Sequence, residues 1–256
     1  MYKRIGLIIG MLTFFLMLFP VEKVYAAEEV LGPLIQTTNP REEYLGLVHL
    51  ELLQTEKNIN GSVEQSIQNV IPSVVRIQTG NFIGSGIILE IEEDTLLIAS
   101  NRHQLIHQEF SGIELYNDEV VSGKRIYLSE KYDLGFLIAD ISNLSYESRS
   151  ELRCIRMEEE REDALVSGAQ MFHVGSTDGV ARNIYQGMIA DTSYYFDEFD
   201  SFMIYNYCEA KAGMSGGGTY DSHGYCIGML TGGYQDESAS LPMKYIREEW
   251  EMLKGQ

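Results

Sequence analysis

Short apolar runs separated by glycines and polar residues fill the chain from residue 62 onward, and this pattern predicts β-strands. The first set of runs lies at residues 72–77, 82–90, 95–100, 113–116, 120–128 and 134–138. The second set lies at residues 166–174, 181–192, 201–207, 217–220 and 225–230. A charged connection at residues 142–163 separates them. We therefore expect two β-barrel-like halves, barrel one at about 70–141 and barrel two at about 164–240.

Helical patterns border these two sets. The segment Ser62-Val63-Glu64-Gln65 places a glutamine three residues after a serine, which is typical of a helix N-terminus. Residues 101–107 follow a strand-like run and predict a short helical turn that contains His103. Apolar residues recur at helical spacing in residues 243–254, so we expect a C-terminal helix that closes the fold.

The N-terminus has a pattern of its own. Lys3 and Arg4 precede an uncharged apolar run at residues 5–21, and Val24-Tyr25-Ala26 follows it. This is the order of a secretory signal, so residues 1–26 predict a signal peptide and a secreted or extracytoplasmic protein. The alternative is an uncleaved membrane anchor at residues 5–21, which would tether the same domain facing outside.

Residues 27–62 are polar and acidic, with Pro33 and Pro40 as breakers, and they predict an N-terminal stalk or extension. The remaining residues, 63–256, form the predicted folded domain.

The charge balance narrows the range of partners. The chain has 19 Lys and Arg against 38 Asp and Glu, a formal net charge of −19. Removal of residues 1–26 would make the chain more negative, because that segment carries more basic than acidic residues. Such a surface repels nucleic acid and anionic lipid, and it either attracts basic polypeptides or is simply the well-solvated surface of a secreted protein. We expect no nucleic-acid partner, and since no zinc-site spacing is present, we expect no metal or cofactor.

Three cysteines are too few for a disulfide-stabilised mini-protein. Cys208 and Cys226 lie on the two apolar runs that flank Ser215. If those runs pair antiparallel, the two thiols come within bridging distance; otherwise they are two buried thiols on neighbouring strands. Cys154 would be left over in either case.

The strongest chemical signal is Ser215, which lies among glycines in the segment AGMSGGG at residues 212–218. Glycines let the backbone turn sharply and aim amide groups inward, where a developing oxyanion can sit. His103 and Asp133 precede it, each beside an apolar run. A histidine that takes the serine proton and an aspartate that orients the histidine make a nucleophilic triad. Because the serine lies in the second half, we place the site between the barrels.

These residues carry a family resemblance. The segments are IPSVVRI at 71–77, GSGII at 84–88, SNRH at 100–103, DLGFL at 133–137 and GMSGG at 213–217. They resemble the landmarks of trypsin-like serine proteases, and more narrowly of the HtrA/Deg type. The resemblance spans residues 62–248, and it implies an all-β fold of two six-stranded β-barrels with a C-terminal helix. It covers the protease domain only, so we expect no PDZ domain in this chain.

The resemblance also assigns roles within the site. It implies a catalytic triad of His103, Asp133 and Ser215, with an oxyanion hole formed by the backbone amides of Gly213 and Ser215, joined by Met214. It further implies a substrate pocket. Thr231, Gly232 and Gly233 would form its wall and Glu209 its base, where a carboxylate favours a basic P1 residue. The alternative is that Glu209 points to solvent.

The sequence thus predicts an exported serine endopeptidase that hydrolyses polypeptides through an acyl-enzyme. The rival hypothesis is a catalytically weak or inactive protease fold that binds peptides as a scaffold. Met214 and Gly218, which replace the family's usual asparagine or aspartate and its proline, motivate that rival.

Overall fold

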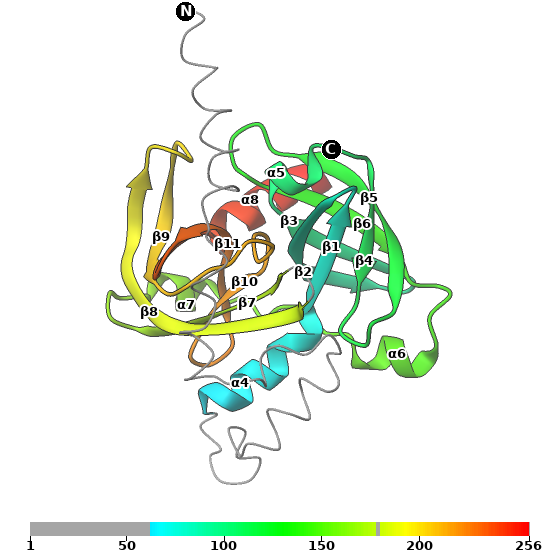
Figure 1. Cartoon of the computed structure of the whole chain (residues 1–256), viewed down its shortest axis with the longest axis horizontal. Helices are drawn as coiled ribbons and strands as arrows, with labels where there is room; N and C mark the ends of the chain where they lie inside the picture. The colour runs from blue at the N-terminus through cyan, green and yellow to red at the C-terminus, as the bar shows by residue number, and fades with distance from the viewer. Residues whose placement is uncertain (1–61, 178–179, 256) are drawn as a thin grey trace, which may run out of the picture. The chain divides into compact units, whose positions relative to one another are not determined.

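The computed structural model describes residues 62–177 and 180–255. Its strands form two closed antiparallel barrels of six strands each, followed by helix α8 (Met243–Lys254), as Figure 1 shows. The predicted two-barrel fold is confirmed. The barrels contact each other where β1 and β2 of the first meet β7 and β8 of the second.

The first barrel has the strand order β1-β2-β3-β6-β5-β4. Its strands are β1 (Val74–Thr79), β2 (Phe82–Glu92), β3 (Thr95–Ser100), β4 (Phe110–Glu114), β5 (Val120–Leu128) and β6 (Gly135–Asp140). Alternating aliphatic residues of these strands fill the interior, among them Ile77, Ile98 and Leu137, which have no exposed surface. The short helix α5 (Arg102–Leu105) follows β3 directly, as the sequence predicted.

Helix α4 (Val63–Val70) leads into the first barrel through a 3₁₀ turn at Ile71–Ser73. The side chain of Ser62 accepts a hydrogen bond from the amide of Gln65, so the predicted N-cap is confirmed. Pro72 lies inside the 3₁₀ turn, where its fixed φ suits the change from helix to strand.

The second barrel has the strand order β10-β11-β12-β9-β8-β7. Its strands are β7 (Gln170–Thr177), β8 (Val180–Phe196), β9 (Ser201–Tyr207), β10 (Gly218–Asp221), β11 (Cys226–Tyr234) and β12 (Glu237–Pro242). The sequence analysis found five of these six strands and missed β12. The missed strand is rich in serine, and both Ser238 and Ser240 point into the barrel.

A buried polar cluster explains why β12 lacks an apolar pattern. His173 of β7 is fully buried, and its ring nitrogens lie 2.8 Å from Ser238 Oγ and 3.0 Å from Thr219 Oγ1. Thr219 Oγ1 lies 2.6 Å from Ser240 Oγ, which also accepts a hydrogen bond from Asn206 Nδ2 at 3.2 Å. Buried polar groups need such partners, so the serines of β12 satisfy the interior of the barrel.

The same topology corrects the proposed disulfide. Cys208 and Cys226 are free and buried. Strand β12 lies between β9 and β11, so the two cysteine-bearing segments are not neighbours, and the antiparallel pairing assumed from the sequence is wrong. Each thiol instead donates to a backbone carbonyl: Cys208 to Tyr185, and Cys226 to Gly228. Burial raises the pKa of the Cys208 thiol to about 12, which keeps it protonated.

The C-terminal helix α8 continues from β12 and also packs on the first barrel. Trp250 meets the ring of Phe136 edge-on at 5.5 Å and donates to Glu90 Oε1 at 2.9 Å. Tyr245 stacks on Tyr132, the residue before Asp133, with ring centroids 4.6 Å apart. The predicted closing helix is confirmed, and it joins the second barrel to the loop that carries Asp133.

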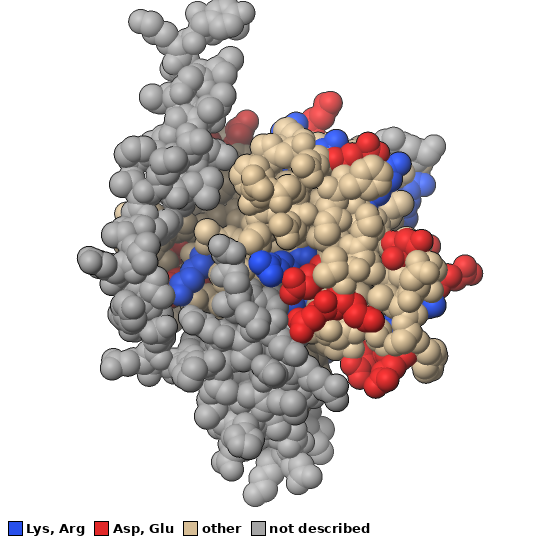
Figure 2. Space-filling model, turned by 45° about the vertical axis from the view of Figure 1, so that its right-hand side comes forward, with Lys and Arg blue, Asp and Glu red and all other residues tan. Residues whose placement is uncertain are grey.

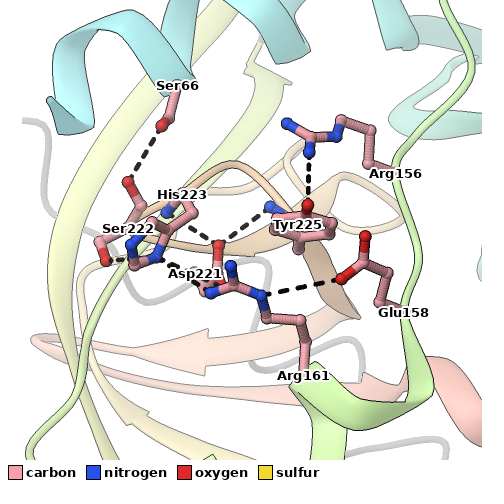
Figure 3. Close-up of polar contacts among 8 residues, drawn as sticks. All are labelled: Ser66, Arg156, Glu158, Arg161, Asp221, Ser222, His223 and Tyr225. Atoms are coloured by element: carbon pink, nitrogen blue, oxygen red, sulfur yellow. Dashed lines mark hydrogen bonds and ion pairs between the residues drawn. The ribbon is translucent and has the colours of Figure 1, made fainter. Parts of the chain in front are cut away.

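The charged connection between the barrels contains two short helices, α6 (Tyr146–Glu151) and α7 (Glu159–Asp163). In Figure 3 the guanidinium groups of Arg156 and Arg161 lie by the ring of Tyr225, at 4.1 and 4.5 Å from its centroid. Arg161 also contacts Asp221 Oδ2 at 3.5 Å. Ser66 of α4 donates to the carbonyl of Ser222 at 3.0 Å. These contacts fix the connection and α4 to the β10–β11 turn.

On the face drawn in Figure 2, acidic side chains cover more of the described surface than basic ones do, in keeping with the net charge of −19. Among the residues that the structure describes, none belongs to a helix with the length and apolar character needed to cross a bilayer. The predicted signal peptide lies outside the described residues, as does the predicted stalk except for Ser62, which caps α4.

Candidate active site

The structure brings His103 and Asp133 together on the first barrel. His103 lies on α5 directly after β3, and Asp133 lies just before β6, which pairs with β3. His103 Nδ1 lies 2.6 Å from Asp133 Oδ2, and the backbone amide of His103 donates to Asp133 Oδ1 at 2.9 Å. Both carboxylate oxygens therefore bind the same residue, which fixes the orientation of the imidazole ring.

Asn101 supports this pair, a role that the sequence analysis missed. Its side chain is fully buried, and Nδ2 donates to the backbone carbonyl of Asp133 at 3.0 Å. The same nitrogen lies 3.5 Å from Thr231 Oγ1 on the second barrel. Asn101 thus ties the aspartate loop to β11. Its place two residues before His103 was the available signal.

Ser215 lies on the loop between β9 and β10, which we call the nucleophile loop (residues 211–217). Gly213 and Gly216 have φ angles of +96° and +88°, a region that favours glycine. A side chain at Gly213 would also approach the carbonyl of Ser176 to 2.7 Å, and one at Gly216 would approach that of Ser85 to 2.1 Å. The glycines that suggested this site are required by its backbone.

Two amides of the loop have no hydrogen-bond partner among the described residues. Within the described part of the chain, no hydrogen bond uses the backbone N–H of Gly213 or Ser215, whereas Gly216 donates to Leu230 and Gly217 to Met214. A free amide on either side of Met214 is the donor pair that an oxyanion hole needs. Met214 itself donates to the carbonyl of Lys211 at 3.0 Å, so its prediction as a third donor is wrong.

The hydroxyl of Ser215 donates to the carbonyl of Thr231 at 3.2 Å. Among the described residues, no hydrogen bond joins Ser215 to His103. Rotation about the serine χ1 moves a hydroxyl between staggered positions at low cost, and catalytic hydrogen bonds are commonly formed only with substrate bound. The third contact of the triad stays a prediction.

The two residues that depart from the family pattern, Met214 and Gly218, have structural explanations. Met214 is fully buried and belongs to the apolar core of the second barrel. Its backbone packs so closely on β7 that a Cβ at Gly175 would approach Met214 Cα to 2.9 Å. At Gly218 a Cβ would lie 2.3 Å from the ring of Tyr220, which is itself buried. Neither substitution touches the two free amides.

The predicted pocket residues lie on β11 and beside the nucleophile loop. Thr231 is buried at a bulge in the pairing of β11 with β12, and a Cβ at Gly232 would lie 3.3 Å from the ring of Phe199. Glu209 is about a third exposed, and its carboxylate lies 3.8 Å from Lys211 Nζ. The role of Glu209 as the base of the pocket stays a prediction, and the sequence analysis missed its pairing with Lys211.

Two closed antiparallel barrels, with a histidine–aspartate pair on one and a glycine-framed serine on the other, define the class of two-barrel serine peptidase domains. The chain belongs to the trypsin-like peptidase domain family, whose model matches residues 84–229. That range contains all three predicted triad residues.

Curated relatives agree with this family. The chain is 25% identical over 198 residues to the pro-apoptotic serine protease NMA111 of Lodderomyces elongisporus, covering 70% of this chain and 19% of that protein. It is 28% identical over 213 residues to the NMA111 protein of Yarrowia lipolytica, covering 74% and 21%. This chain therefore spans about a fifth of the length of these relatives.

Solved structures show the same fold. The HtrA-type protease AlgW with a tripeptide matches with a TM-score of 0.63 and 19% identity, over 73% of this chain and 62% of that one. AlgW with a decapeptide gives 0.65 and 18%, over 77% and 68%. The serine endoprotease from Yersinia pestis gives 0.63 and 18%, also over 77% and 68%. The predicted HtrA-like architecture is confirmed.

Proposed function

We propose that this chain is an exported serine endopeptidase that cleaves polypeptides through a covalent acyl-enzyme. Ser215 is the nucleophile, His103 the general base and acid, and Asp133 the residue that orients His103. The amides of Gly213 and Ser215 form the oxyanion hole.

In the acylation step, His103 Nε2 takes the proton of Ser215 Oγ as that oxygen attacks the carbonyl carbon of the scissile bond. The Asp133 carboxylate holds the proton on Nδ1, which leaves Nε2 free as the base and stabilises the imidazolium. The negative oxygen of the tetrahedral intermediate accepts hydrogen bonds from Gly213 and Ser215. The C–N bond then breaks, and His103 returns the proton to the leaving amine.

Deacylation repeats these steps with water. His103 removes a proton from a water molecule that attacks the ester carbonyl, and the same two amides stabilise the second tetrahedral intermediate. The ester bond to Ser215 breaks, the serine recovers its proton from His103, and the free carboxylate product leaves.

The observation that carries this proposal is the pair of free amides at Gly213 and Ser215. The rival hypothesis of a scaffold with a degenerate loop expects that pair to be lost. Met214, which motivated the rival, instead anchors the loop in the core. Loss of one oxyanion donor costs about 10²–10³ in rate, so an intact pair supports catalysis.

The proposed substrates are polypeptides with a basic P1 residue. Related HtrA-type structures hold a tripeptide and a decapeptide, which supports a peptide-binding cleft. The net charge of −19 attracts basic chains over long range. Glu209 would then supply the carboxylate for P1, in competition with its ion pair to Lys211.

Export is supported by the basic, apolar and small-residue order of residues 1–26. We place the domain outside the cytoplasmic membrane. Retention of residues 5–21 as an anchor would tether it there.

Fluorophosphonate labelling tests the proposed activity. The purified protein should label at Ser215 and cleave casein at pH 8, and Ser215→Ala should abolish labelling and lower kcat by about 10⁴–10⁶. Ser193→Ala, which removes an exposed serine hydroxyl from β8, is the matched control and should behave as wild type. Absence of both Ser215-dependent labelling and cleavage would favour the scaffold hypothesis.

A further inference from the structure

Ser85 links the two barrels at the nucleophile loop, and nothing in the triad chemistry explains why. It lies on β2 of the first barrel, in the segment GSG at residues 84–86, and it has no exposed surface. We infer that Ser85 is a positioning residue that holds the oxyanion hole in its working geometry. This inference rests on the proposed peptidase function.

The side chain of Ser85 contacts two segments of the second barrel. Its hydroxyl donates to the carbonyl of Gly213 at 2.9 Å and accepts a hydrogen bond from the amide of Ser176 at 2.7 Å. Both the donor and the acceptor function of the hydroxyl are therefore used. Ser85 joins the end of β7 to the nucleophile loop.

The backbone of Ser85 contributes two more hydrogen bonds. Its amide donates to the carbonyl of Ser215 at 2.8 Å, and its carbonyl accepts from Ser100 Oγ at 2.7 Å. These backbone contacts do not depend on the Ser85 side chain. A substitution at this position therefore isolates the effect of the hydroxyl.

The position of the Gly213 carbonyl decides how the oxyanion donors are aimed. The planar peptide unit between Gly213 and Met214 separates the two donor amides. Its oxygen is held by Ser85 Oγ, and its N–H is held by the carbonyl of Lys211 at 3.0 Å. Both ends of this peptide are therefore fixed, which determines the angle between the donors of Gly213 and Ser215.

Gly213 also lacks the side chain that would restrict rotation of its backbone. Its φ is +96°, and a glycine adopts positive and negative φ values about equally readily. Without the Ser85 hydroxyl, the buried carbonyl of Gly213 loses its donor, and rotation about Gly213 offers a way to find another. Such a rotation turns the donor amides away from the oxyanion.

Because Ser85 is fully buried, we expect it to act on the reaction through the loop and not by touching substrate. A change there should affect the transition state, where the oxyanion exists, and leave substrate binding unchanged. This separates the positioning role from a contribution to the pocket or to general stability.

The test compares Ser85→Ala with Ser111→Ala. Ser111 is also a buried hydroxyl of the first barrel, and among the described residues its side chain pairs only with Thr79 Oγ1, at 2.8 Å. The Ser85 variant should lose about 10–100-fold in kcat with KM unchanged, less than the cost of deleting an oxyanion donor. A peptide aldehyde, which forms a tetrahedral adduct, should bind more weakly by the same factor. The Ser111 variant should keep wild-type kcat at a similar loss of thermal stability.

Ser85→Cys covers the case in which the alanine variant does not fold. A thiol nearly conserves the volume but is a weak donor, so kcat should fall while the melting temperature stays near that of wild type. The pH dependence of kcat should be unchanged in both variants, because neither touches His103 or Asp133.

The outcomes separate the two proposals. If wild-type protein does not label with a fluorophosphonate, the peptidase function fails and this inference fails with it. If wild type labels, and Ser85→Ala loses no more kcat than Ser111→Ala, only the positioning role is overturned. A rise in KM at constant kcat, or a Ser85→Cys variant with full kcat, overturns it as well.

Discussion

Asp133 binds His103 through both carboxylate oxygens, one to the ring nitrogen and one to the backbone amide. The backbone contact fixes the carboxylate even when the ring moves, so the aspartate presents the same oxygen to Nδ1 throughout the cycle. Asn101 holds the other side of this loop through the carbonyl of Asp133. The histidine is thus oriented by two separate polar contacts that involve the same aspartate.

Asp133→Asn should lower kcat by about 10⁴ with little change in KM, because an amide can present a donor to the ring and stabilise the wrong tautomer. Steady-state kinetics on a peptide substrate measure both kcat and KM of the variant. Asp140→Asn is the control, because Asp140 lies at the far end of β6, the strand that follows Asp133, and its carboxylate accepts a hydrogen bond from the amide of Ser142 at 2.8 Å. A loss below tenfold in the Asp133 variant would contradict the proposed orienting role.

Glu209→Gln tests the proposed P1 preference at the residue scale. If Glu209 binds a basic P1 side chain, the ratio of kcat/KM for lysine over alanine at P1 should fall about tenfold, since a charged pair becomes a neutral contact. The effect is limited by the exposure of Glu209 and by its pairing with Lys211. Glu198→Gln, an exposed acidic residue of the β8–β9 turn, serves as control. An unchanged ratio would mean that Glu209 faces solvent.

At the scale of elements, the second barrel combines an apolar core with an interior polar cluster. His173, Thr219, Ser238, Ser240 and Asn206 connect four of its strands through side-chain hydrogen bonds. Burial lowers the pKa of His173 to about 3. The neutral ring is therefore part of the folded barrel, and protonation is resisted down to acid pH.

This shift predicts a pH dependence of stability. The folded pKa of His173 lies below its unfolded value of about 6.5, so the group has no effect above pH 6.5. As the pH falls from 6.5 toward 3, the unfolded chain gains a proton that the folded chain does not. The unfolding free energy should then drop by about 1 kcal/mol per pH unit from this group. Urea titrations of wild type and His173→Gln at pH 7 and pH 5 measure the difference. Equal losses in the two proteins would contradict it.

Helix α8 is the second element with a clear energetic test. Trp250→Ala removes the ring contact with Phe136 and the hydrogen bond to Glu90. We expect a loss of about 2–3 kcal/mol in unfolding free energy, since the ring is only partly buried. Met252→Ala, half-exposed on the same helix, should cost much less. Similar losses from both variants would show that α8 does not stabilise the first barrel.

At the scale of the molecule, the proposed active site exists only where the barrels meet. The first barrel supplies His103 and Asp133, and the second supplies Ser215. Arg182 of β8 strengthens this junction: it is fully buried and donates to the carbonyl of Val74 on β1, with Nε at 3.2 Å and Nη2 at 3.1 Å. Contacts outside the proposed triad thus also join the two barrels.

The export proposal predicts the start of the mature protein. Exported protein should begin at Ala27, because the small residues before it fit signal cleavage. N-terminal sequencing of secreted material measures this. Ala26→Phe should block cleavage and leave the protein membrane-bound, whereas Glu28→Gln should not. Wild-type protein that retains residues 5–21 would instead support the anchor.

The sequence predicted most of the fold because most strands of both barrels are short apolar runs separated by glycines and polar residues. The sequence analysis missed strand β12 because its buried residues include serines, whose polar partners lie on strands distant in sequence. The predicted disulfide was wrong for a related reason. Cys208 and Cys226 lie on the two apolar runs that flank Ser215 in the sequence, but β12 lies between these segments in the barrel.

At the site, the three triad positions followed from residue type and local flanks. The supporting residues could not, because their roles depend on contacts between barrels. Ser85 lies 130 positions before Ser215 in the chain, yet the structure joins them by a backbone hydrogen bond of 2.8 Å. Only the closed topology shows which buried hydroxyl reaches the nucleophile loop.

The division of the site between two barrels has a consequence for the cell that makes this protein. Synthesis proceeds from the N-terminus, so His103 and Asp133 leave the ribosome well before Ser215. A partial chain that has folded only its first barrel contains the base His103 but not the nucleophile Ser215. It therefore cannot cleave other polypeptides. Proteolytic capacity arises only when the second barrel closes and docks. The order of the two barrels along the chain thus delays proteolytic activity until the last step of folding.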